Sequence, residues 1–478
     1  MEFNYSPEII GIVLALIYVM AIASAVDALL QGRTAQGSIA WVVSLLAVPY
    51  ISVPLYLVFG RNKFDGYIRE RAQIEAQAEA RLQIPRSELL DFQASDTSAA
   101  FYRSLHSLAR LPTVRGNAVT LLIDGYATFD SIEAGLRSAK QYILFQFYIL
   151  RDDALGQRLG AVLAERAQAG LRVYLLYDEV GSRSFGSSQL HRTLQKAGVQ
   201  LAAFDTRQGW RNRFQINFRN HRKVVVVDGT SAWIGGHNVG IEYLGESKKR
   251  GPWRDTHVKV EGPAVIGAKL TFATDWLWAR REQLDINWQV ERYTPGNCSV
   301  LLFPSDPASE FDEAGLMFHQ VITQARDRIW IASPYFVPDR GIIAALQLAA
   351  LRGVDVRVMI PDTADGPVVG LANWSFTREL LPAGVAVYRY EPAFMHQKVL
   401  LMDRELAGVG TANFDNRSFR LNFEITALVH DEAFCDEVET MLLTDFSQSR
   451  LVTVDELARK PFWFPLATAA ARLMSPVL

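Results

Sequence analysis

The sequence predicts an α/β protein of two tandem domains, preceded by a pair of membrane-spanning helices. Three observations support this fold class. Two long apolar runs lie near the N-terminus, the same order of strands and helices occurs twice after residue 111, and each copy holds one His-x-Lys-x4-Asp motif. At 478 residues the chain is long enough for two or three domains with separate cores. Its net charge of -2 gives no overall attraction to nucleic acid, so we expect no nucleic-acid partner.

The two apolar runs cover residues 9–26 and 38–59. At about 1.5 Å of rise per residue, each is long enough to cross a hydrocarbon core of roughly 30 Å. The alternatives are a buried core helix and a signal peptide, but the first eight residues carry Glu2 and Glu8 and no basic residue, unlike a signal peptide. We therefore predict a transmembrane hairpin at residues 1–60, with its second helix kinked by Pro49 and Pro54.

Basic residues near the helix ends predict the orientation of this hairpin, because they are retained on the cytoplasmic side. The turn between the runs holds only Arg33, whereas four basic residues follow the second run: Arg61, Lys63, Arg69 and Arg71. The large C-terminal part should therefore face the cytoplasm. Residues 61–110 are rich in Ala, Gln, Glu and Arg, which favours a helical linker. It could lie along the membrane surface or be solvated on all sides.

The remaining chain contains an internal repeat. The first copy has predicted strands at 119–123, 142–149 and 173–177, with helices at 129–139 and 155–169. The second has strands at 300–303, 329–332 and 356–360, with helices at 311–325 and 342–352. Units this long indicate duplicated domains rather than a solenoid. We place the two domains at 111–295 and 296–478.

The repeat is clearest in two motif segments, HRKVVVVDGTSAWIGGHN at 221–238 and HQKVLLMDRELAGVGTAN at 396–413. Both keep the same residue types at the same spacing: His221, Lys223, Asp228 and Asn238 in the first, and His396, Lys398, Asp403 and Asn413 in the second. With Lys and Asp each expected at roughly one position in twenty, two such matches inside a matching repeat are unlikely by chance. We take these residues as the candidate active site.

The spacing also predicts geometry. A His and a Lys two residues apart point to the same face of a strand, and the four apolar residues that follow suit a strand buried on both faces. Asp228 and Asp403 have the opposite parity, so we expect them to stabilise the site by pairing or turn bonding rather than to attack substrate.

Two His-Lys pairs suit transfer of a phosphodiester. A neutral imidazole can attack phosphorus while a protonated one gives its proton to the leaving oxygen. Lysines beside a buried strand need an anion such as phosphate. Asp255 and Glu424 follow the motifs in apolar segments and could orient the imidazoles, or form ordinary ion pairs. The sequence lacks a P-loop, an HExxH pattern and any Cys/His metal spacing, so we expect no nucleotide cofactor and no metal.

The paired motifs, the continuation GTANFDNRSF at 410–419 and the segment WRDTHVKVEGPAV at 253–265 resemble the phospholipase D superfamily. With its N-terminal hairpin, the whole chain resembles the membrane-anchored cardiolipin synthases of bacteria. The resemblance implies two phospholipase D-like α/β sandwich domains in a pseudo-twofold arrangement, with both motifs at the shared interface. It also implies a multi-pass protein of the bacterial inner membrane whose catalytic domains face the cytoplasm.

The implied reaction joins two phosphatidylglycerol molecules into cardiolipin and releases glycerol through a phosphatidyl-histidine intermediate. By analogy His221 is the nucleophile and His396 the acid and then the base. Lys223, Lys398, Asn238 and Asn413 would hold the phosphate oxygens. The alternatives are hydrolysis to phosphatidic acid, headgroup exchange with another alcohol, and a non-catalytic lipid-binding scaffold. Both motifs are intact, which argues against the scaffold.

Overall fold

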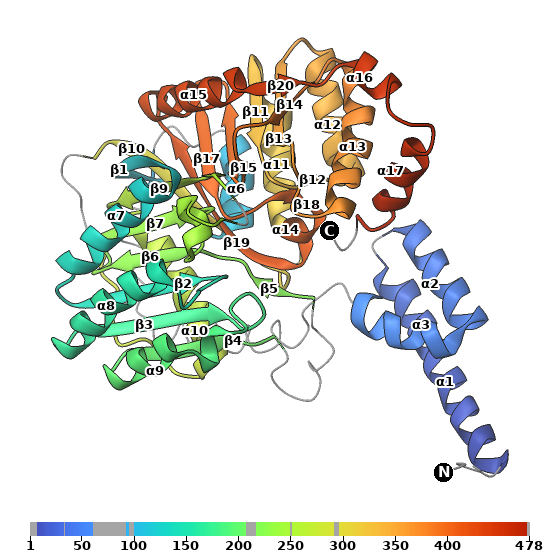
Figure 1. Cartoon of the computed structure of the whole chain (residues 1–478), viewed down its shortest axis with the longest axis horizontal. Helices are drawn as coiled ribbons and strands as arrows, with labels where there is room; N and C mark the ends of the chain where they lie inside the picture. Colours follow the sequence, from blue (N-terminus) through green and yellow to red (C-terminus); the bar gives the residue numbers. More distant parts are fainter. Residues whose placement is uncertain are drawn as a thin grey trace. The chain divides into compact units, whose positions relative to one another are not determined.

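The computed structural model describes residues 7–32, 34–60, 92–94, 100–206, 217–248, 251–290 and 296–475 (Figure 1). Most of the predicted linker at 61–110 lies outside the described residues. The chain divides into two compact units. One comprises Met1–Ile68 and Thr206–Phe218, and the other Arg69–Asp205 and Arg219–Leu478.

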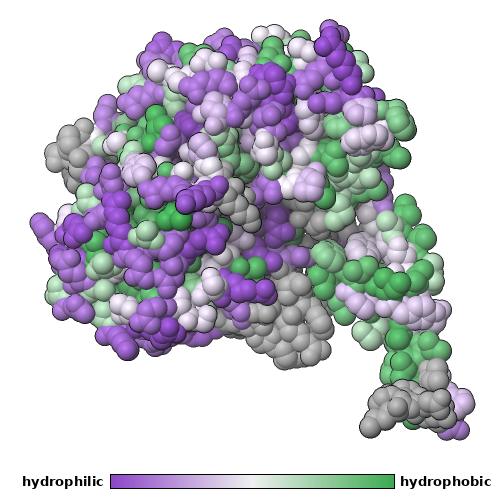
Figure 2. Space-filling model, in the orientation of Figure 1, coloured by the Kyte–Doolittle hydropathy of each residue, from purple (hydrophilic) through white to green (hydrophobic). Residues whose placement is uncertain are grey.

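The first unit is helical. It holds α1 (Pro7–Gln31), α2 (Ala35–Ala47), α3 (Pro49–Leu55) and the π-helical turn η1 (Tyr56–Gly60). Within the described part of the chain, α1 alone has the length and apolar composition to cross a membrane. Most of its large apolar side chains are exposed, and Figure 2 shows green, hydrophobic surface over the helices of this unit.

The second apolar run does not form one continuous helix. It breaks at Val48, whose φ of -138° and ψ of 62° lie outside the helical region, and a new helix begins at Pro49. Proline at the first position of a helix is favourable, whereas in the interior it removes a hydrogen bond and clashes with the preceding turn. The predicted kink at Pro49 is thus a helix boundary, and Pro54 lies inside α3.

The second unit is α/β, as predicted, and is built on one large sheet. Sixteen strands form it: β1 (Val114–Ile123), β2 (Tyr142–Phe147), β3 (Arg172–Asp178), β4 (Gln200–Phe204), β5 (Arg219–Asn220), β6 (Val224–Val227), β7 (Ser231–Gly235), β9 (Thr256–Glu261), β10 (Cys298–Ser305), β11 (Arg328–Ala332), β13 (Asp355–Pro361), β14 (Ala386–Tyr390), β16 (Val399–Met402), β17 (Leu406–Gly410), β19 (Asn422–His430) and β20 (Ser449–Leu451). Two short pairs lie apart from it: β8 (Trp253–Arg254) with β15 (Phe394–Met395), and β12 (Phe336–Val337) with β18 (Phe414–Asp415).

The strand order shows the duplication directly. From the centre outward, one half runs β1-β9-β7-β6-β2-β3-β4 and the other β10-β19-β17-β16-β11-β13-β14. The halves meet where β1 and β10 pair antiparallel, with Val114 opposite Val300. Each strand of the first half has a counterpart at the same place in the second. The two α/β domains expected from the sequence therefore share one continuous sheet.

Helices cover the sheet in corresponding places. The first half carries α7 (Asp124–Ser138), α8 (Ala154–Gln168), α9 (Gln189–Lys196) and α10 (Val265–Arg280), and the second carries α11 (Glu313–Gln324), α12 (Arg340–Leu351), α13 (Pro367–Leu380) and α15 (Glu432–Ser447). Shorter helices complete the second half: α14 (Asn416–Arg420), α16 (Val454–Ala458) and α17 (Phe464–Arg472). Each half has its own apolar core, and α6 (Ala100–Ala109) adds Phe101 and Leu105 to the core of the second half.

The motif strands are as predicted, but the motif His and Lys are not on them. Strands β6 and β16 consist of the four apolar residues after each Lys, and every one is buried. Residues 221–223 and 396–398 precede these strands as irregular segments. The physical reason is that the chain must first cross from the other half. His221 N–H donates to the carbonyl of Phe423 on β19, and the chain joins its own sheet only at Val224.

Candidate active site

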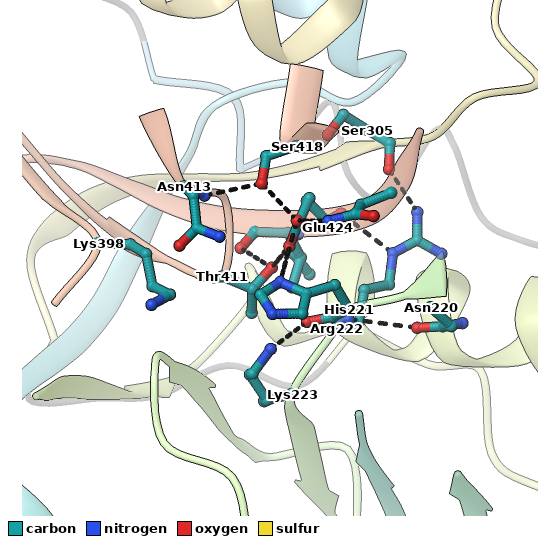
Figure 3. A network of polar contacts seen from close by, with 12 residues as sticks. Asn220, His221, Arg222, Lys223, Ser305, Lys398, Thr411, Asn413, Ser418 and Glu424 are labelled. Atoms are coloured by element: carbon teal, nitrogen blue, oxygen red, sulfur yellow. Dashed lines mark hydrogen bonds and ion pairs between the residues drawn. The ribbon is translucent and has the colours of Figure 1, made fainter. Parts of the chain in front are cut away.

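The motif histidines each contact a carboxylate from the opposite half. His221 Nδ1 lies 3.0 Å from both Oε1 and Oε2 of Glu424 on β19 (Figure 3). His396 Nδ1 lies 2.7 Å from Oδ2 of Asp255, which stands between β8 and β9. All four side chains are buried. The pairing is therefore crossed, and neither motif has a complete His-carboxylate pair within its own half.

The backbone makes the same crossing. Strand β5, which leads to His221, pairs in parallel with the start of β19, and β15, which leads to His396, pairs in parallel with β8. His221 N–H donates to Phe423 O at 3.0 Å, and His396 N–H donates to Arg254 O at 2.7 Å. Each motif thus enters the site along an edge supplied by the other half. This arrangement makes one shared site rather than two separate ones.

The environment of His221 keeps its imidazole neutral. Burial, with the nearby charge of Lys223, lowers its pKa to about 4 in spite of the opposing effect of Glu424. Burial alone would raise the pKa of Glu424, but His221 and Lys223 hold it below its ordinary value. An ionised carboxylate only accepts hydrogen bonds, so Nδ1 of His221 carries the proton and Nε2 keeps a free lone pair.

Glu424 is itself fixed by neighbours on its own half. Thr411 Oγ1 donates to Oε2 at 2.6 Å, Ser418 Oγ donates to Oε1 at 2.8 Å, and Asn422 Nδ2 donates to Oε1 at 3.1 Å (Figure 3). These bonds hold the carboxylate, and through it the imidazole ring, in one orientation.

Both motif lysines are buried and directed back to their own histidines. Lys223 Nζ donates to the His221 carbonyl, and Lys398 Nζ to the His396 carbonyl, each at 2.5 Å. Burial lowers the pKa of Lys223 to about 7 and that of Lys398 to about 8. A buried ammonium is costly without an anion, and the carboxylates of Glu424 and Asp255 act on both lysines to favour their charged forms.

The two motif asparagines line the same cavity but are bonded differently. Asn238 accepts the backbone N–H of Ile149 at 3.0 Å and donates to Tyr243 Oη at 2.7 Å. The side-chain amide of Asn413 makes no hydrogen bond within the described part of the chain, and its Oδ1 is buried without a partner. The whole amide of Asn413 is thus available to a ligand, whereas that of Asn238 has one N–H left.

The motif aspartates lie away from the cavity. Asp228 accepts the backbone N–H groups of Lys140, Gln141 and Tyr142 at 2.7–2.9 Å. Asp403 binds the equivalent groups before β11, those of Arg326, Asp327 and Arg328. Both aspartates adopt positive φ, 52° and 53°, which short polar side chains tolerate. Each carboxylate joins the turn after one strand to the start of its neighbour.

The cavity between the halves has a volume of about 440 Å³. It is lined by both motif histidines and asparagines and by Arg219, together with residues that the sequence patterns did not identify: Tyr148, Arg151, Glu242, Tyr243, Trp253, Phe394 and Arg417. Most stand on two-residue strands or in short helices: β8, β15, α14 and the 3-10 helix Ile241–Leu244. Elements this short show no periodic pattern that distinguishes a lining residue from any other. His237 and His257 contact each other at 3.0 Å between their Nδ1 atoms and do not line this cavity.

Comparison with known proteins identifies the family. Residues 132–248 and 318–445 match the family model described as cardiolipin synthase, PLD-like domain, and residues 19–61 match the phospholipase D-nuclease N-terminal model. The cardiolipin synthase A of Pseudomonas putida (strain W619) is 45% identical over 99% of this chain and 99% of its own length. That of Pseudomonas fluorescens (strain SBW25) is 44% identical over 100% of both chains.

A solved structure shows the same fold. The crystal structure of phosphatidylserine synthase from Haemophilus influenzae Rd KW20 superposes with a TM-score of 0.62, at 16% sequence identity. The superposition covers 80% of this chain and 100% of the synthase chain.

Proposed function

This chain belongs to the cardiolipin synthase family of phospholipase D-like proteins, and we propose that it transfers the phosphatidyl group of one phosphatidylglycerol to another. The products are cardiolipin and glycerol. The observation that carries this proposal is the pair of crossed histidine-carboxylate contacts around one cavity, with a buried lysine bonded to the backbone of each histidine. Such a site offers a nucleophile, an acid and a receptor for a single phosphodiester.

In the first step Nε2 of His221 attacks the phosphorus of the donor lipid. The bond from phosphorus to the headgroup oxygen breaks, and protonated His396 gives its proton to that oxygen, so glycerol leaves. The result is a phosphatidyl group on His221 and a neutral His396. The low pKa of His221 supports its assignment as the nucleophile, because its imidazole is unprotonated at neutral pH.

In the second step the terminal hydroxyl of another phosphatidylglycerol attacks the same phosphorus. Neutral His396 takes the hydroxyl proton, the phosphorus–nitrogen bond breaks, and cardiolipin forms. Both histidines return to their starting states. Glu424 and Asp255 position the rings and stabilise each imidazolium as it forms.

The other motif residues support this chemistry from around the phosphate. Lys223 and Lys398 neutralise the charge that develops on the non-bridging oxygens, and Asn413 donates from its side-chain amide. Asn238 lies beside them. One N–H of its amide bonds Tyr243 Oη, and the other donates to the phosphate. Asp228 and Asp403 hold the loops that carry the site rather than the substrate.

The substrate places the enzyme at a membrane. We assign α1 and the apolar segments α2 and α3 to a hairpin in the bacterial inner membrane, with the catalytic unit in the cytoplasm. The apolar length of α1, the match of residues 19–61 to the N-terminal family model and the basic residues after the second run support this. Its lipid partners are then phosphatidylglycerol and cardiolipin.

The proposal is tested with purified protein in mixed micelles that contain labelled phosphatidylglycerol, without CTP and without added metal. Cardiolipin and glycerol should appear in equal amounts. Phosphatidic acid as the sole lipid product would indicate a hydrolase instead. Lipid binding without turnover would indicate a scaffold.

A further inference from the structure

The two halves of the cavity differ chemically, although the motifs that build them are alike. Two residues before each motif histidine stands Arg219 in the first half and Phe394 in the second. Four residues after each motif asparagine stands Glu242 in the first half and Arg417 in the second. All four line the cavity. The pseudo-twofold relationship is therefore broken at the positions that contact the contents of the site.

Because the pairing of the halves is crossed, these differences place different side chains next to His221 and next to His396. Arg219 lies on β5 opposite Asn422, so the approach to His221 holds a cation and a polar group beside the single ring of Tyr148, 4.9 Å from that of His221. Phe394 lies on β15 opposite Trp253, so the approach to His396 is aromatic. The ring of Trp253 is 5.3 Å from that of His396 and 4.8 Å from that of Tyr243. Phe394 is 6.1 Å from His396.

Glu242 is one of three carboxylates that line the cavity, with Asp365 and Asp415, and an unpaired carboxylate would repel phosphate. Its side chain is 11% exposed, and Oε1 accepts a hydrogen bond from Arg151 Nε at 2.5 Å. The ion pair has no net charge, which removes the repulsion and also weakens any attraction for a free cation. A carboxylate held in this way remains a strong acceptor for neutral hydroxyl groups.

A donor without a partner lies beside it. The indole Nε1–H of Trp253 is buried and makes no hydrogen bond within the described part of the chain. Buried polar groups are nearly always bonded, and this one has no protein partner, so the oxygen of a ligand would satisfy it. Aromatic faces, one donor and one acceptor together suit a small polyol, which presents C–H surfaces and hydroxyl groups.

We propose that Glu242, Trp253 and Phe394 form a glycerol subsite on the His396 side of the cavity. The inference rests on the proposed function, in which His396 protonates the departing glycerol and later deprotonates the glycerol hydroxyl of the acceptor. Both groups must then lie next to His396. The subsite holds the headgroup glycerol of the donor first and that of the acceptor second.

This subsite explains how the enzyme favours a lipid hydroxyl over water. The subsite holds the glycerol hydroxyl beside His396 as a positioned nucleophile, whereas water makes no contact with the aromatic faces that would hold it there. It also predicts a preference for glycerol over ethanolamine as an acceptor, since Arg151 already neutralises the carboxylate that an ammonium group would need.

The test is the reverse reaction, in which the full-length enzyme converts cardiolipin and free glycerol into two phosphatidylglycerols. The KM for glycerol is measured for the wild type, for Glu242→Gln and for the matched control Glu246→Gln. Glu246 contacts Tyr126 and does not line the cavity. Loss of a charged acceptor should raise the KM for glycerol at least about tenfold in Glu242→Gln, with a much smaller change in kcat. The control should behave as wild type.

A second variant keeps the proposal testable if Glu242→Gln does not fold. Trp253→Phe retains an aromatic ring, although a smaller one, and removes the indole donor, and it should also raise the KM for glycerol. In both variants the ratio of phosphatidic acid to phosphatidylglycerol should increase, because water competes better. Unchanged KM and product ratio in folded variants, or ethanolamine outcompeting glycerol in the wild type, would overturn the subsite. Failure of the wild type to make cardiolipin would instead overturn the proposed function.

Discussion

His221 and Glu424 lie 3.0 Å apart across the boundary between the two halves of the catalytic unit. The equivalent contact of His396 with Asp255 runs in the opposite direction across the same boundary. Each half therefore supplies the imidazole of one pair and the carboxylate of the other. The imidazole rings are therefore oriented only when the two halves pack against each other, because neither pair exists within one half.

The first prediction concerns the carboxylate of Glu424. In Glu424→Gln the amide keeps the size of the side chain but can place a donor towards Nδ1, which favours the wrong tautomer of His221. We expect kcat for cardiolipin synthesis to fall by roughly 10²–10⁴-fold without loss of the fold. Steady-state kinetics and a thermal melt measure the two effects, with the exposed Glu437→Gln as control. Activity near that of the wild type would show that Glu424 does not position His221.

A second prediction follows from the titration of the site. The pKa of His221 is about 4, so its nucleophile becomes protonated only in acid. The pKa values of Lys223 and Lys398 are about 7 and 8, so the cations that hold phosphate lose their protons as pH rises through that range. We expect kcat/KM for phosphatidylglycerol to rise above about pH 4 and to decline above pH 7–8. A pH profile in mixed micelles measures this, and a value that is still constant at pH 9 would contradict it.

The motif aspartates should affect stability more than chemistry. Asp228→Ala removes the acceptor for three backbone N–H groups and places a β-carbon without a polar group at a φ of 52°. We expect unfolding to become easier by about 3 kcal/mol, with a similar effect for Asp403→Ala. Denaturant unfolding in detergent measures the change. A stable variant without activity would assign Asp228 a direct chemical role.

A buried ion pair links the halves below the site. Arg222 Nη1 donates to Asp275 Oδ1 at 2.6 Å within the first half, while its other nitrogens donate to the carbonyls of Ser305 and Glu424 in the second. In Asp275→Ala the guanidinium stays buried without its counterion, so we expect a loss of about 3–5 kcal/mol. The exposed pair of Arg404 and Asp436 provides the control, because Asp436→Ala should cause no measurable shift in the same unfolding experiment.

Orientation in the membrane can be tested with a reporter fused after Leu478. A reporter enzyme that is active only in the cytoplasm should give a signal, and a reporter that is active only in the periplasm should give none. The opposite result would reverse the assignment of the catalytic unit to the cytoplasm.

The duplicated fold was predictable because its signal is local. The four apolar residues after Lys223 and Lys398 specify buried strands wherever the rest of the chain lies, and the repeated order of elements specifies two domains. The break at Val48 was not predictable in the same way, because proline can either kink a helix or begin one. The position of the histidines before their strands depends on pairing with the opposite half, which periodicity does not reveal.

The residues of the candidate site were likewise predictable only in part. Asp255 and Glu424 stood out as carboxylates in apolar segments, but the sequence does not say which histidine each contacts. That depends on how residues far apart in the chain pack. Glu242 and Trp253 were not predicted for the same reason, since their place in the cavity wall depends on the packing of segments that are far apart in the chain. A comparison of equivalent positions in the two copies is the one sequence signal that would have indicated Glu242.

The most direct test of a single site built from two motifs is the activity of His221→Ala, His396→Ala and the double variant. If the histidines act on one phosphorus, each single variant should lower kcat for cardiolipin synthesis by at least roughly 10³-fold, and the double variant should be no worse. Two single variants that each keep about half of the activity, with loss only in the double variant, would mean independent sites and would contradict the account.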